Sequence, residues 1–185
     1  MSLLVTFPSA GHHLKDAGAT YNGRQENLET IKFRDLLVLE LKKLGIKIIT
    51  DKDTQTNRAY QNSIQPGDGS VILDIHFNAG GATATGTECL VSDKEYYKPN
   101  SLSKRMADEI CQITSTILNI KNRGVKSETT TRHGKLGILH QGAGVAVLWE
   151  ICFISNKEDM AKYDANINGL ARAIAKICKK YDDLR

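Results

Sequence analysis

No apolar run in the 185-residue sequence approaches the ~18 residues that a membrane-spanning helix requires. Its longest basic runs are the pairs at residues 42–43 and 179–180, so the net charge of +4 is spread along the chain. Nucleic-acid-binding proteins carry denser basic patches. The N-terminus lacks the basic segment and the longer apolar run of a signal peptide. We therefore expect no membrane span, no nucleic acid partner and no signal peptide in this chain.

Closely spaced cysteine pairs and linkers are absent as well. Cys89, Cys111, Cys152 and Cys178 lie far apart and form no CxxC motif, so we expect reduced cysteines that act as small core residues. No internal repeat, low-complexity tract or Pro/Ser-rich linker divides the chain. We expect one domain spanning residues 1–185.

The apolar residues that are present alternate between strand-like runs and helix-like spacing. Strands are expected at residues 3–7, 46–50, 71–77, 87–91 and 145–153, and helices at 26–44, 57–64, 101–118 and 167–181. Residues 119–136 follow neither pattern and are expected to form a loop. Strands that alternate with helices indicate an α/β fold with a mostly parallel sheet and helices on both faces. Ligands of such sheets bind outside the carboxyl ends of the strands.

Two of the expected buried strands contain ionisable side chains. Glu150 lies in the otherwise apolar run 145–154, and Asp74 and His76 share one face of the strand at 71–77. Burying an ionised carboxylate costs roughly several kcal/mol unless something compensates for it. A basic side chain, a shifted pKa or a nearby metal site would each compensate. These strands therefore predict a catalytic site at one edge of the sheet.

Four residues fit together as such a site. His12 follows the first strand, Glu26 begins the long helix, and His76 and Glu150 lie near strand ends. Two histidines and one carboxylate form the ligand set of a hydrolytic zinc centre, and Glu150 would suit the general base. Each residue also has a structural interpretation. The histidines would form ordinary hydrogen bonds, Glu26 would be stabilised by the dipole of the helix that it begins, and Glu150 would pair with a buried cation.

Six segments, in order along the chain, resemble the type 3 family of zinc-dependent N-acetylmuramoyl-L-alanine amidases, which are bacterial cell-wall hydrolases and phage endolysins. The matching segments are GH at 11–12 with DAGA at 16–19, Glu26 nineteen residues before Gly45, DIHFNA at 74–79, GTE at 86–88, NRGVK at 122–126, and LWEICFISN at 148–156 followed by Glu158 and Asp159. The last segment is the most specific, and the ordered set covers most of the chain.

This resemblance implies a single α/β domain with a central mixed sheet of about six strands between helices. It implies hydrolysis of the amide that joins the lactyl group of N-acetylmuramic acid to L-alanine of the peptidoglycan stem peptide. His12, Glu26 and His76 would bind one zinc ion per chain, and Glu150 would be the general base. The implied partner is peptidoglycan.

The chain departs from the family pattern at two positions. Asp74 stands where serine is usual, and it would either orient His76 or pair with a cation. Asp51 stands where arginine is usual. His13 is a second candidate for the role of His12, which is preferred because it follows Gly11. His133 and His140 precede the strand of Glu150. Contact of one of them with substrate is an alternative, but we expect structural or exposed roles for both.

Other functions remain open at the level of sequence. A zinc peptidase that cuts a different amide would use the same residues, and a non-catalytic peptidoglycan-binding domain would keep the fold. We expect no separate wall-binding domain. The chain would act on the cell wall, either as a phage-type lysin released from the cytoplasm or as an exported protein whose signal is trimmed. The sequence specifies no oligomeric state.

Overall fold

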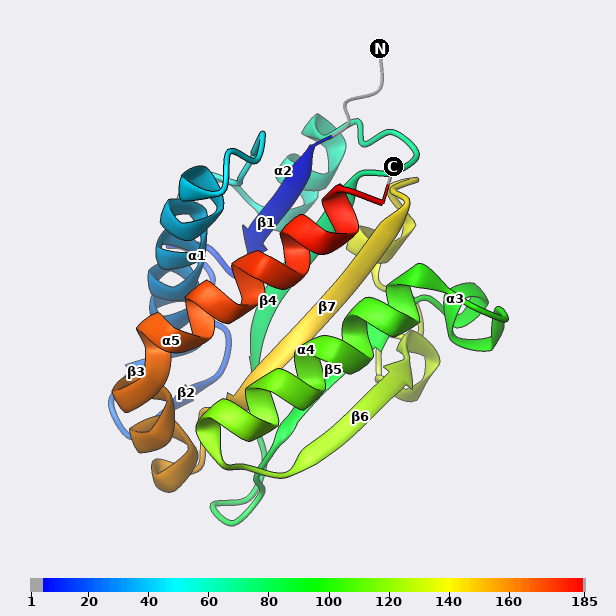
Figure 1. Ribbon diagram of the computed structural model, residues 1–185. Helices are drawn as coiled ribbons and strands as arrows, with labels where there is room; N and C mark the ends of the chain where they lie inside the picture. Colours follow the sequence, from blue (N-terminus) through cyan, green and yellow to red (C-terminus); the bar gives the residue numbers. More distant parts are fainter. Residues whose placement is uncertain (1–4, 185) are drawn as a thin grey trace.

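A mixed five-stranded sheet with strand order β1-β4-β7-β5-β6 runs through the centre of the protein (Figure 1). The computed structural model describes residues 5–184. In chain order its elements are β1 (Thr6–Ala10), β2 (Thr20–Tyr21), β3 (Arg24–Gln25), α1 (Glu26–Lys43), α2 (Asn57–Ser63), β4 (Val71–Asn78), β5 (Thr87–Val91), α3 (Asp93–Tyr97), α4 (Leu102–Leu118), β6 (Asn122–Ser127), the 3-10 turns η1 (Glu128–Thr130) and η2 (Gly137–His140), β7 (Val145–Phe153) and α5 (Lys157–Asp182). The predicted α/β class is confirmed.

One reversal of direction makes the sheet mixed. Strands β1, β4 and β7 are parallel, β5 is antiparallel to β7, and β6 is parallel to β5. The amino ends of β5 and β6 therefore lie at the same edge of the sheet as the carboxyl ends of β1, β4 and β7. Residues from both sets of strands can meet at that edge.

The two faces of the sheet are covered unequally. Helices α1, α4 and α5 lie over one face (Figure 1), where Phe33 packs edge-to-face against Trp149 with ring centroids 5.3 Å apart. On the other face, α2 and η2 contribute a smaller apolar cluster that includes Tyr60, Ile72 and Leu148. Toward the strand ends at the shared edge, the side chains on this second face become polar. Helices thus lie on both faces, as predicted, but the second face leaves room for a site.

Two strand predictions differ from the structure. Residues 46–50 form only one isolated bridge, from Ile48 to Thr6, because the chain runs briefly beside the edge strand β1 and then turns away. Residues 119–136, predicted as a loop, contain β6, an edge strand whose polar sequence gave no apolar alternation. The first expected strand falls partly on residues 1–4, which lie outside the described residues, and β1 extends to Ala10.

The helix predictions at 26–44, 57–64 and 101–118 are confirmed within one residue at each end. The last helix starts earlier than predicted, at Lys157 instead of residue 167. The side chain of Asn156 caps it by accepting hydrogen bonds from the backbone N–H groups of Glu158 and Asp159. Asp159 is buried and accepts further hydrogen bonds from Gly86 and Phe153, which fixes the start of α5 against the sheet.

All four cysteines are buried and unbridged, as expected. Burial raises the pKa of the Cys178 thiol to about 12, so this thiol stays protonated. Between residues 5 and 184 no helix is both long and apolar enough to cross a bilayer.

Candidate metal centre and catalytic site

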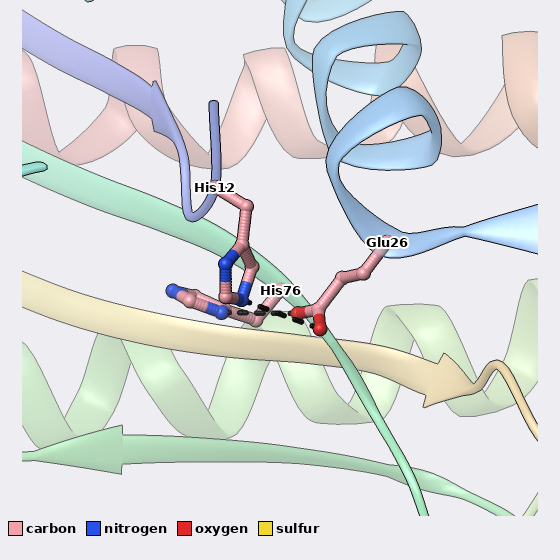
Figure 2. Close-up of side chains that lie close together, drawn as sticks. All are labelled: His12, Glu26 and His76. Atoms are coloured by element: carbon pink, nitrogen blue, oxygen red, sulfur yellow. Dashed lines mark hydrogen bonds and ion pairs between the residues drawn. The ribbon is translucent and has the colours of Figure 1, made fainter. Parts of the chain in front are cut away.

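Three side chains from distant segments converge at the carboxyl edge of the parallel strands (Figure 2). His12 comes from the loop after β1, Glu26 is the first residue of α1, and His76 lies near the end of β4. One ligand atom from each residue lies within 4.8 Å of the other two. No other group of three or more potential ligands of this kind occurs among residues 5–184.

Glu26 is the central member of this group. Its Oε2 atom lies 3.3 Å from Nε2 of His12, and its Oε1 atom lies 3.1 Å from Nδ1 of His76 (Figure 2). The same two oxygens accept hydrogen bonds from the backbone N–H groups of Ala19 and Phe77. Glu26 is buried, so both of its oxygens are held in place by neighbouring backbone as well as by the histidines.

Each histidine has a second carboxylate on the nitrogen that faces away from Glu26. Nδ1 of His12 lies 2.9 Å from Asp16, and Nε2 of His76 lies 3.2 Å from Asp74. Asp74 is itself fixed by a 2.6 Å hydrogen bond that Ser9 donates. Carboxylates in this position orient metal-binding histidines and set their tautomers. Here they leave Nε2 of His12 and Nδ1 of His76 free to face Glu26.

The electrostatics of the group favour positive charge at its centre. Burial opposes ionisation of Glu26, but hydrogen bonds from His12 and His76 outweigh burial and hold the pKa of Glu26 well below its usual range. Burial also opposes ionisation of His76 and so lowers its pKa, but the Asp74 and Glu26 carboxylates raise this pKa well above its usual value. The carboxylates that stabilise a proton on these rings would also stabilise a divalent cation.

Two glycines allow the rings to approach the backbone. A Cβ atom at Gly11 would lie 2.1 Å from Cε1 and from Nε2 of His76, and one at Gly18 would lie 2.7 Å from Oε2 of Glu26. Gly18 also has a φ of +62°, a conformation that side-chain-bearing residues rarely adopt. The loop that carries His12 can close over the site only with glycine at these positions.

Glu150 is placed beside this group by strand register. It pairs with His76 of β4 on one side and with Glu88 of β5 on the other, so the three side chains share one face of the sheet. Its Oε2 atom is buried and has no hydrogen-bond partner among the described residues. Burial raises the pKa of Glu150 to about 7. No lysine or arginine among residues 5–184 forms an ion pair with it, which contradicts the structural interpretation of Glu150.

The structure separates the other sequence candidates from the cluster. Nδ1 of His13 accepts a hydrogen bond from the backbone of Lys15, and His13 is not part of the group. His140 pairs with the buried Glu128 at 2.7 Å, and His133 interacts with the neighbouring Arg132. His133 and His140 therefore have the structural or exposed roles that were expected.

Asp51 has a partner that its sequence position did not indicate. The buried Arg34 of α1 donates to Asp51 at 2.9 Å, and Asp51 accepts a hydrogen bond from the backbone of Ala10. The pair thus connects α1 to the end of β1, where the loop that carries His12 begins. Asp16 was assigned no role from the sequence. Its position four residues after His12 is the feature that indicates its contact with the ring of His12.

The fold and the cluster define a class of protein: an α/β domain with two histidines and one carboxylate, a set that could hold a metal ion, at the ends of its parallel strands. The family described as N-acetylmuramoyl-L-alanine amidase matches residues 9–180. The chain therefore belongs to this family of cell-wall hydrolases.

Known proteins similar to this chain agree with that assignment. The N-acetylmuramoyl-L-alanine amidase CwlM of Bacillus licheniformis is 26% identical over 186 residues, which cover 92% of this chain and 69% of CwlM. Cwp6 from Clostridium difficile has a TM-score of 0.78 at 27% identity and covers 96% of this chain, which spans 29% of Cwp6. The crystal structure of the putative N-acetylmuramoyl-L-alanine amidase from Neisseria meningitidis has a TM-score of 0.75 at 24% identity, with 95% of this chain and 94% of that chain covered. This likeness supports the fold alone.

Replacing Gly11 with alanine should displace the ring of His76, because the new methyl group would overlap it. We expect altered histidine ring signals in long-range ¹H–¹⁵N NMR spectra and a loss of roughly 1–3 kcal/mol in the free energy of unfolding. Gly81→Ala is the matched control, since a Cβ at Gly81 meets open space. Unchanged His76 signals in Gly11→Ala would contradict the close approach.

Proposed function

We propose that this chain hydrolyses the amide between the lactyl group of N-acetylmuramic acid and L-alanine of the stem peptide, with one zinc ion held by His12, Glu26 and His76. The observation that carries the proposal is the convergence of these three side chains next to Glu150, which has no cation partner among the described residues. Membership of the amidase family supports the reaction.

The residues fit a zinc ion by their chemistry. Two imidazole nitrogens and one carboxylate oxygen are a common set of protein ligands in catalytic zinc sites, which keep one position open. Asp16 and Asp74 engage the outer nitrogens of the two histidines and so direct the inner nitrogens toward Glu26. When bound, zinc would act as a Lewis acid that polarises the scissile carbonyl.

Glu150 is assigned the proton transfers. Its carboxylate would accept a proton from the attacking water as the water oxygen bonds to the carbonyl carbon. It would then return that proton to the nitrogen of L-alanine as the carbon–nitrogen bond breaks. A pKa near neutrality suits a group that both accepts and donates a proton.

Residues 1–185 would act as one catalytic domain on the cell wall, with peptidoglycan as the partner. Release from the cytoplasm as a phage-type lysin and export with a trimmed signal would each deliver the chain to this substrate.

Digestion of purified cell walls tests the reaction. An amidase produces new α-amino groups on L-alanine without new reducing sugars. New termini inside the stem peptide would instead identify a peptidase, and binding without any new ends would identify a non-catalytic domain.

Glu150→Gln should lower wall-digesting activity by roughly 10²–10⁴-fold, the usual contribution of general acid–base catalysis. Zinc content should stay near one per chain because the three ligands remain. The melting temperature should hold or rise, since the change removes a charge whose buried oxygen has no partner among the described residues.

A structural Glu150 predicts the opposite pattern. Loss of a buried ion pair would destabilise the protein by roughly 3–5 kcal/mol. A variant that melts much earlier yet keeps near-normal activity per folded molecule would end the catalytic assignment.

His12→Ala should lose most of the bound zinc, whereas His13→Ala should retain about one ion per chain. The two residues are adjacent, so the second variant is a matched control for removing an imidazole from this loop. Elemental analysis of protein purified without chelator measures both. The reverse result would transfer the ligand role to His13.

Asp74→Ala should weaken zinc affinity by roughly 10–100-fold, because the outer nitrogen of His76 would lose the carboxylate that orients its ring. Competition with a chelating dye measures the affinity directly. Asp16→Ala should have a smaller effect, since Asp16 is half-exposed and water can replace it. Unchanged affinity in Asp74→Ala would mean that Asp74 does not position His76.

A further inference from the structure

A cluster of two cations lies beside Glu150 and has no role in the proposed reaction. Glu88, the register partner of Glu150, accepts hydrogen bonds at its Oε2 atom from Arg123 and from Lys126. Asn78 donates to the other oxygen of Glu88 at 2.9 Å. One buried carboxylate therefore faces two cations, and the cluster keeps a net positive charge.

Arg123 is held by contacts with three residues, but its guanidinium is only partly hydrogen-bonded. Its aliphatic stem lies against the backbone at Gly86, where a Cβ atom would approach its Cγ to 2.9 Å. Its guanidinium carbon lies 5.0 Å from the ring centroid of Phe153. Only Nε donates a hydrogen bond to a described residue, and the side chain is 30% exposed. Both terminal NH2 groups are thus oriented without a protein acceptor among the described residues.

The position of Arg123 places the two NH2 groups of its guanidinium on one defined side of the reacting bond. His76, Glu150, Glu88 and Arg123 come from β4, β7, β5 and β6, which are neighbours in that order across the sheet. The end of this row at His76 is rich in carboxylates, and the other end carries the two cations. The two cations would attract an anionic group of the substrate to their end of the row.

We infer that the terminal NH2 groups of Arg123 bind a free carboxylate of the stem peptide, that of the residue that follows L-alanine. A planar guanidinium with two free NH2 groups matches a carboxylate in a bidentate arrangement. Neighbouring strands lie roughly 4.8 Å apart, so β6 lies about 10 Å from β7. Two extended peptide residues span roughly 7 Å. The side chain of Arg123 extends from β6 toward Glu88 and covers the remaining distance. This subsite rests on the proposed function, because it takes L-alanine to lie at Glu150.

The test compares two soluble muropeptides that differ at one group. Both contain N-acetylmuramoyl-L-alanine linked to a γ-bonded D-glutamyl residue; one has a free α-carboxylate and the other has the α-amide. The wild-type chain should cleave the acid with a kcat/KM roughly 10- to 100-fold above that for the amide, as expected when charge-assisted hydrogen bonds become neutral ones.

Arg123→Gln should remove this preference, mainly by raising KM for the acid, and should lower kcat/KM for the amide much less than for the acid. Arg123→Lys keeps a charge beside Glu88 and should fold even where the glutamine variant does not. It should lose much of the preference, because an ammonium cannot form the bidentate arrangement. Arg172→Gln, an exposed position on α5, is the charge-matched control and should retain the preference.

The outcomes separate this subsite from the reaction itself. Equal cleavage of acid and amide by the wild-type chain, or an equal loss on both in the Arg123 variants, would overturn the subsite and leave the amidase proposal intact. Cleavage of neither substrate at the L-alanine amide would contradict the proposed function, and the subsite with it.

Discussion

The buried carboxylate of Glu26 is the constraint on which the site depends. Placing an ionised group at the start of α1, inside the protein, is costly unless each oxygen is satisfied. Four groups surround it: ring nitrogens of His12 and His76, and the backbone N–H groups of Ala19 and Phe77. These contacts join the loop after β1, the first helix and the end of β4, so the fold and the ligand geometry are stabilised by the same interactions.

The reversal between β7 and β5 determines what surrounds that carboxylate. Because β5 and β6 run opposite to β7, their first residues lie at the edge where the parallel strands end. Glu88 and Arg123 are thereby placed in line with Glu150 on one face. In an all-parallel sheet the carboxyl ends of β5 and β6 would lie at the site instead of their amino ends. The row of side chains that leads from carboxylates to cations would then be lost.

Much of the fold was predictable because its signals are local. Helical spacing marks the helices, and apolar runs mark β4, β5 and β7. β6 could not be predicted, because this polar edge strand is defined by its pairing with β5. Residues 46–50 have strand-like composition, but beyond Ile49 the side chains of Thr50 and Asp51, instead of backbone groups, bond to Pro8 and Ala10 of β1, so the backbone pairing does not continue.

The sequence alone identified the ligand types and the anomalous Glu150, because a carboxylate in an apolar run and an ordered set of short motifs are visible without coordinates. The preceding Gly11 already favoured His12 over His13, and the tertiary structure places His12 in the cluster. Only the tertiary structure gave Asp74 a histidine instead of a cation and left Glu150 without an ion-pair partner among the described residues. The reason is physical. Adjacent residues of a loop point in different directions, and the partner of a buried charge comes from whichever segment the fold packs against it.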